Sequence, residues 1–250
     1  MKKINTILAA LSALLMLTVT SANSVEFKAG VSANGMAAYA NATETLKGDG
    51  AGTGGQTGRI TNEEAVLATS FASIFAEISS DELMGLGIGV SYAPEVADLN
   101  KETRVIQNCR DRSGTDATAC TPESSDDVDT GTQSVDAKIN DFVSIYLTLP
   151  VGDSGAYVKA GYIQATMVTE ESLATGSKYE DVDMTGTQIG GGYEGSLGDM
   201  AFWRAEGSYQ MWEDIRADGS EANASDDSTK NKIEAELGSV TGSLSIGMKF

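Results

Sequence analysis

The side chains that could carry out chemistry in this sequence lack the usual general base. The chain of 250 residues contains no histidine, the residue that most often activates a serine or cysteine nucleophile. Its 36 acidic residues could supply the carboxylate pair of a glycosidase, but no spacing in the sequence brings two of them to one site. We therefore predict that the protein is not an enzyme and has no cofactor.

The two cysteines, Cys109 and Cys120, lie close together in a polar, turn-rich stretch. Two thiolates without histidine make a poor zinc site, because zinc takes a tetrahedral set of such ligands. In an exported protein a pair of this kind is most simply a local disulfide that closes a loop. We predict a Cys109–Cys120 disulfide.

Two further segments hint at ligand binding without the required patterns. The glycine-rich residues 48–55 could cradle a phosphate, but no Gly-Lys-Ser/Thr follows them. The acidic residues 126–131 could suggest calcium, but they lack the spacing and final glutamate of an EF-hand loop. A flexible loop and a solvated acidic loop are the simpler interpretations, and we predict no metal site.

The first 22 residues have the features of a signal peptide. Lys2 and Lys3 precede an apolar stretch at 7–19, and the small residues 20–22 suit a signal peptidase. The apolar stretch is shorter than the about 20 residues of a transmembrane helix. A buried N-terminal helix and cleavage after Ser24 are the alternatives. We predict export, with residues 1–22 removed and 23–250 forming one domain.

The exported part alternates apolar with small or polar residues, the period of β-strands. Long and short connections follow each other strictly along the chain, which places both chain ends on the side of the short turns. A soluble sandwich or a lipocalin-like barrel would also alternate, but would have no reason to segregate connections by length. The eight predicted strands are 25–40, 64–78, 83–93, 135–149, 156–168, 182–194, 200–213 and a last strand after residue 231 that ends at residue 250.

One face of each predicted strand is apolar and the other is polar, so we expect lipid outside and polar side chains inside. An eight-stranded barrel has an interior that its own side chains can fill. Charges placed there must be paired. The interpretation is a polar plug, with a selectivity ring as the alternative. The predicted polar network of the lumen consists of Lys28, Glu77, Lys138, Lys159, Arg204 and Glu206.

The chain ends on an alternating strand with a terminal aromatic residue. Its apolar face is formed by Leu244, Ile246, Met248 and Phe250. This ending resembles the C-terminal signal of bacterial outer-membrane β-barrels, which the barrel-assembly machinery recognises. With the signal peptide and the strand layout, the chain resembles the small OmpA-like and OmpX-like barrels. The resemblance implies an all-β, eight-stranded, antiparallel up-and-down transmembrane barrel in the outer membrane of a Gram-negative cell, with short periplasmic turns and long external loops.

Acidic residues outnumber basic ones in each of the four long connections, and the whole chain carries a formal charge of −19. Such a surface repels nucleic acid and favours cations or basic partners. We expect a monomer in contact with outer-membrane lipid, with divalent ions bridging loop carboxylates to lipopolysaccharide. The predicted role is structural, or an interaction of the loops with an extracellular ligand or phage. The alternative is a small porin-like passive channel.

Overall fold

The computed structural model describes residues 25–46, 59–98, 102–109, 128–172, 179–222 and 230–250. Strands account for most of these residues, and none of the helical structure among them is long and apolar enough to cross a bilayer. The strands are β1 (Val25–Leu46), β2 (Arg59–Ser80), β3 (Leu86–Asp98), β4 (Glu102–Cys109), β5 (Val128–Pro150), β6 (Ala156–Ser172), β7 (Val182–Ser196), β8 (Ala201–Trp212), β9 (Ile215–Ala222) and β10 (Lys230–Lys249).

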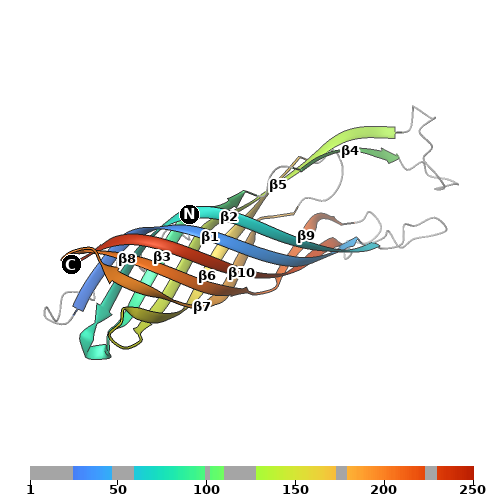
Figure 1. The fold of residues 1–250 in the computed structure, drawn as a ribbon. Helices are drawn as coiled ribbons and strands as arrows, with labels where there is room; N and C mark the ends of the chain where they lie inside the picture. The colour runs from blue at the N-terminus through green and yellow to red at the C-terminus, as the bar shows by residue number, and fades with distance from the viewer. Residues whose placement is uncertain (1–24, 47–58, 99–101, 110–127, 173–178, 223–229) are drawn as a thin grey trace.

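Eight of these strands close into one antiparallel barrel (Figure 1). The wall follows the order β1-β2-β3-β5-β6-β7-β8-β10, and β10 pairs back with β1 along almost its whole length. Closure removes the free sheet edges that would otherwise leave backbone groups without partners. The predicted all-β, up-and-down, eight-stranded barrel is confirmed.

The wall strands are tilted relative to the barrel axis. A path that starts at Ile189 on β7 and steps to the paired residue on each next strand, through β8, β10 and β1, reaches Ala68 on β2. The path in the other direction, through β6, β5 and β3, reaches Ile78, which is ten residues away on the same strand. A closed sheet returns to a shifted position only if its strands are staggered and inclined, so the register itself shows the tilt.

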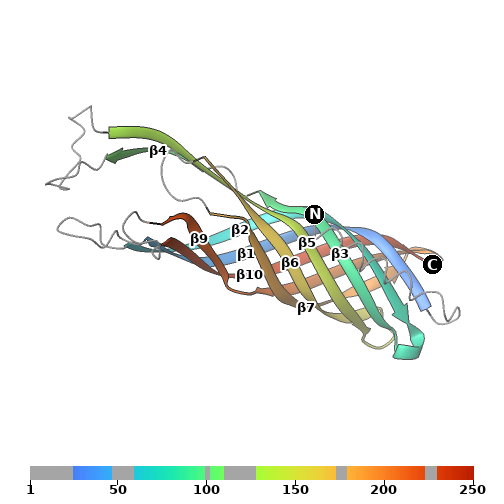
Figure 2. The ribbon, with the colours of Figure 1, turned by 180° about the vertical axis from the view of Figure 1, so that it is seen from behind.

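The two ends of the barrel differ. Short turns at 81–85, 151–155 and 197–200 lie at one end with the C terminus, here called the turn end. The opposite end, here called the loop end, carries β4, paired with the start of β5, and β9, paired with the start of β10. In both views the β4–β5 arm leaves the wall and diverges from the ends of β1 and β2 (Figure 2).

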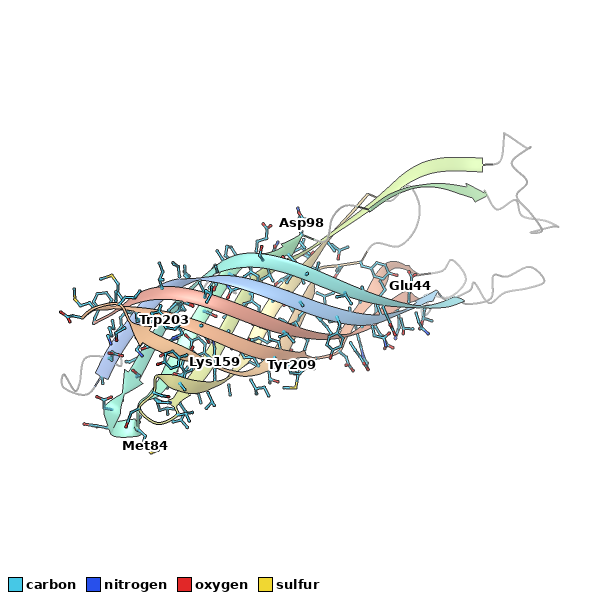
Figure 3. All side chains as sticks on the ribbon, in the orientation of Figure 1. Glu44, Met84, Asp98, Lys159, Trp203 and Tyr209 are labelled. Carbon is cyan, nitrogen blue, oxygen red and sulfur yellow. The ribbon has the colours of Figure 1, made fainter. Side chains whose placement is uncertain are left out.

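Some predicted boundaries were wrong. β4 and β9 lie in stretches predicted as loops, where short polar sequences pair locally with a neighbouring wall strand. The third strand begins at Leu86 rather than at residue 83, because Asp81–Leu83 is a 3-10 turn. Met84 then takes a left-handed conformation with φ 58°, and it lies at the tip of this turn (Figure 3).

Candidate functional site

A chain of ion pairs crosses the lumen in the turn-end half of the barrel. Arg204 on β8 donates from Nη1 and Nη2 to both carboxylate oxygens of Glu77 on β2, at 3.0 and 3.1 Å. It also reaches Glu194 on β7, with Nη2 2.7 Å from Oε2. Glu194 in turn accepts a 2.9 Å hydrogen bond from Lys28 Nζ on β1. The forked guanidinium thus joins strands from opposite sides of the lumen by two-pronged contacts.

This network is buried. Glu77 and Arg204 each expose 2% of their surface. Aromatic rings surround the guanidinium, with its Cζ 5.3 Å from the ring centroid of Phe75, 5.2 Å from that of Tyr157 and 5.4 Å from that of Phe202. Arginine tolerates this setting because it combines weak hydration with stacking on aromatic faces.

A second ion pair lies in the same half of the lumen. Lys159 Nζ on β6 donates to Glu206 Oε1 on β8 at 2.9 Å, and it lies 4.0 Å from the ring centroid of Tyr146 (Figure 3). Both side chains point into the lumen, and the opposite faces of β6 and β8 are apolar. The two ion-paired groups, with the rings packed on them, occupy the lumen at this level, as expected for a narrow barrel.

Above these charges the lumen changes character toward the loop end. A middle layer consists of hydrogen-bonded hydroxyl and amide side chains, including Gln188 with Ser144 and Ser239 with Gln210. Beyond it lies a buried apolar cluster rather than further polar groups. Its members are Met36, Ala38, Ala93, Val96, Ala97, Ile139, Phe142, Ile163, Ala165, Met184 and Ile215.

The structure brings together five of the six predicted lumen residues, in two groups at the turn end. Lys138 lies elsewhere, opposite Asp98 and Val168 in the loop-end half of the wall. A bulge explains this placement, since the register of β5 shifts between Asn140 and Val143, where Asp141 has a φ of 54°. An extra residue in a strand reverses which face the preceding residues occupy.

Sequence reasoning missed Glu194, which bridges Lys28 and Arg204. The signal was available, because Glu194 has the same parity along β7 as the buried Gln188. The predicted strand, 182–194, ends at this residue, whereas β7 continues to Ser196. Cys109 ends β4, whereas Cys120 lies outside the described residues, so the disulfide stays a prediction. Among the described residues no three His, Cys, Asp or Glu side chains form a group that could hold a metal ion.

The outer face of the barrel is apolar around its circumference. Val31, Leu147 and Ile246 are about half exposed or more, and they alternate along their strands with buried polar side chains. Soluble proteins rarely expose continuous apolar surfaces of this size, whereas a bilayer solvates them. Other exposed apolar residues of this face are Ile74, Ile88, Ile145, Val158, Tyr162, Ile189, Trp203, Tyr209, Val240, Leu244 and Met248.

Comparison with known proteins finds similar solved structures only. No family model and no curated protein matches the sequence. The outer membrane protein OprG from Pseudomonas aeruginosa is 14% identical, with 91% of this chain and 96% of that chain covered and a TM-score of 0.44. The outer membrane protease OmpT from Escherichia coli is 12% identical, with 93% and 100% covered and a TM-score of 0.42. Ail of Yersinia pestis, in complex with a heparin analogue, is 13% identical, with 88% and 99% covered and a TM-score of 0.37.

One of these similar proteins is a protease, and a fold by itself does not decide between enzymes and other barrels. The physical properties of this chain decide its class. The closed wall, the apolar outer face and the charged, filled interior define a transmembrane β-barrel of the outer-membrane type.

The terminal residue closes the barrel at its rim. Phe250 exchanges backbone hydrogen bonds of 2.9 and 3.2 Å with Phe27, and the two rings lie 6.0 Å apart. Deleting Phe250 removes these contacts and the end of the predicted assembly signal. We therefore expect most of the folded protein to be lost from the outer membrane, measured as the heat-modifiable gel band of membrane fractions. Leu197→Ala, in a turn at the same end, serves as the control, and unchanged assembly without Phe250 would contradict the prediction.

Proposed function

We propose that this barrel has no catalytic role and acts as a surface-interaction protein through the acidic side chains at its loop end. The observation that carries the proposal is the difference between the wall, whose lumen is filled, and the loop end, where strands project. Side chains of the wall fill the lumen with charge pairs and an apolar cluster, while the β4–β5 arm projects beyond the wall (Figure 1). The longest part of the chain that projects into water toward a partner is therefore at the loop end.

The loop end favours a basic partner. Glu64 on β2 and Glu236 on β10 are exposed and both pair with Asn41 on β1, so they lie on the two sides of β1 at the same level of the wall. Glu44 lies near the same end (Figure 3). Closely spaced like charges raise the local concentration of cations and speed the association of basic molecules. The negative charge at the loop end therefore favours a cationic peptide or protein surface as the partner over a polyanion.

Binding to immobilised polylysine tests the proposal with the full-length barrel in nanodiscs, where both ends are accessible. We expect E64Q/E236Q to bind severalfold more weakly at physiological salt, because the two lost charges lie at the binding end. The matched control, D153N/D199N, removes two exposed carboxylates from short turns at the opposite end. Equal weakening of both variants would contradict a loop-end interaction, as would a preference for heparin over polylysine.

A passive channel is the second candidate, supported by the polar middle layer of the lumen. The ion pairs on one side of that layer and the apolar cluster on the other oppose conduction, since charged plugs and apolar constrictions both block ions. We expect no large, steady conductance in planar bilayers. Large, steady channels recorded from the wild-type protein would contradict the sealed barrel and support the passive channel.

A further inference from the structure

The apolar belt on the outside of the barrel is taller on one side than on the other. On β1 the outward residues are apolar or glycine over positions 27–39, and the next outward residue is the exposed Asn41. On β6 they are apolar only over positions 156–162, and the half-buried Gln164 follows. At a rise of about 3.3 Å per residue and a strand tilt of about 40°, these stretches span about 30 Å and about 15 Å along the barrel axis.

The neighbouring strands repeat the two patterns. β10, which pairs with β1, presents apolar residues or glycine outward as far as Gly238, before Glu236 follows. β7, which pairs with β6, presents Ile189 and then Thr187 toward the loop end. We call the outer faces of β1 and β10 the tall side (Figure 1) and those of β6 and β7 the short side (Figure 2).

The two sides start level at the turn end. In register, Val158 on β6 leads through Gly191 on β7 and Gly207 on β8 to Gly242 on β10. Because the strands are tilted, each of these steps rises about 3 Å toward the loop end, and four residues back along β10 lower the level by about as much as the three steps raise it. Ile246 on β10 therefore lies level with Val158, and both side chains are exposed on the apolar outer face.

The same two strands differ farther toward the loop end. Gln164 and Val240 each lie six residues beyond Val158 and Ile246, respectively, so these two residues are also level. Val240 is apolar and 54% exposed, whereas the side chain at that level on the short side is an amide, with Thr166 as the next outward residue. A hydrocarbon layer of uniform thickness around the barrel would fit only one of the two sides.

Hydrogen bonds between strands hold polar side chains in place on the short side. Thr166 Oγ1 on β6 donates to Asp183 Oδ1 on β7 at 3.4 Å. Thr185 Oγ1 on β7 donates to a carboxylate oxygen of Glu213, which follows β8 directly. Asp183 and Glu213 are exposed, and a charged group is far costlier in hydrocarbon than among headgroups. The short side therefore disfavours hydrocarbon at a level where the tall side still requires it.

We propose that the barrel thins the bilayer against its short side, where headgroups and water of the loop-end leaflet descend to Gln164 and Thr187. Outer-membrane barrels usually carry an apolar band about 25 Å tall. The tall side exceeds this height and the short side falls below it, and a bilayer accommodates a short apolar stretch by thinning locally at a small cost per ångström. The partner of the short side is thus the polar layer of the membrane itself.

A tilt of the whole barrel is the competing explanation. A tilted barrel meets both membrane surfaces at the same angle. Bringing Gln164 nearer to the loop-end surface than Val240 would therefore also move Val158 farther from the turn-end surface than Ile246. Thinning changes only the loop-end leaflet and leaves Val158 and Ile246 at equal depth, as their position at the same level of the wall favours. The two level pairs thus separate thinning from tilt.

Spin labels at the two level pairs test the proposal. Q164C, V240C, V158C and I246C are each made in a background in which serine replaces both native cysteines, so that a nitroxide attaches at one site. Collision rates in dioleoylphosphatidylcholine vesicles are measured with oxygen, which concentrates in hydrocarbon, and with a nickel chelate, which stays in water. We expect the nickel-to-oxygen ratio to be severalfold higher at Q164C than at V240C. The ratios at V158C and I246C should be low and equal.

The other outcomes would overturn the proposal. Equal, low ratios at Q164C and V240C would show a bilayer of full thickness on both sides, and equal, high ratios would show a barrel whose tall side stands in water. A higher ratio at I246C than at V158C would show a tilted barrel. Protection of Q164C from both agents would show that a second copy or another protein covers the short side. The heat-modifiable gel band confirms that each labelled variant is folded.

Discussion

Arg204→Ala is expected to lower the free energy of unfolding by about 3–5 kcal/mol, the usual consequence of removing one partner of a buried ion pair. The loss arises because Glu77 keeps a buried carboxylate whose hydrogen bonds at 3.0 and 3.1 Å both came from Arg204. Glu194 still has Lys28 as a partner, so the damage concentrates on Glu77. Urea titration in bicelles, followed by the gel mobility of folded and unfolded protein, measures the change.

The matched control is Arg216→Ala. Arg216 forms a 3.6 Å ion pair with Glu234, but both side chains are largely exposed to solvent. Exposed pairs contribute at most about 1 kcal/mol, so this variant should unfold almost as the wild type does. The double variant E77Q/R204M should recover part of the stability lost in Arg204→Ala, because it removes the unpaired charge. A loss for Arg204→Ala no larger than that for Arg216→Ala would show that the network does not support the fold.

Phe202→Ala is expected to destabilise the barrel by about 3–5 kcal/mol, the range for truncating a fully buried phenylalanine. Phe202 exposes 0% of its surface, and its ring lies 6.2 Å from that of Phe75. It also lies beneath the ammonium group of Lys28 and the guanidinium of Arg204. Truncation leaves a cavity in the lumen and removes one wall of the charged network, as the same urea titration would detect.

The neighbouring residue supplies the control for this prediction. Trp203 is of similar size but points outward, exposes 37% of its surface and contacts Tyr193 with ring centroids 5.7 Å apart. Trp203→Ala exchanges protein contacts partly for lipid contacts, so its loss of stability should be clearly smaller. Equal losses for the two variants would mean that the filled lumen contributes no more to the barrel than its outer face does.

The alternation of residues determined the architecture. In the strand around Arg204 the apolar residues at odd positions and the polar residues at even positions predicted lipid outside and charge inside, and the exposed Trp203, Tyr209 and Met211 confirm the outward face. The strict succession of long and short connections predicted the two different ends. These features are local, because the side-chain period of a strand and the chemistry of a turn depend on only a few neighbouring residues.

Only the tertiary structure decided which inward residues meet. Glu77 and Arg204 are far apart in the sequence, and their contact depends on the stagger with which β1 and β10 close the barrel. The bulge at Asp141 had the same dependence, since it follows from how β5 fits its neighbour β6. The sequence alone therefore determined an eight-stranded barrel with an apolar outer face and charged side chains in its lumen, whereas the apolar cluster at the loop end appeared only in the structure. Its register decided the partners of each charge, because pairing between distant strands is set by closure of the whole sheet.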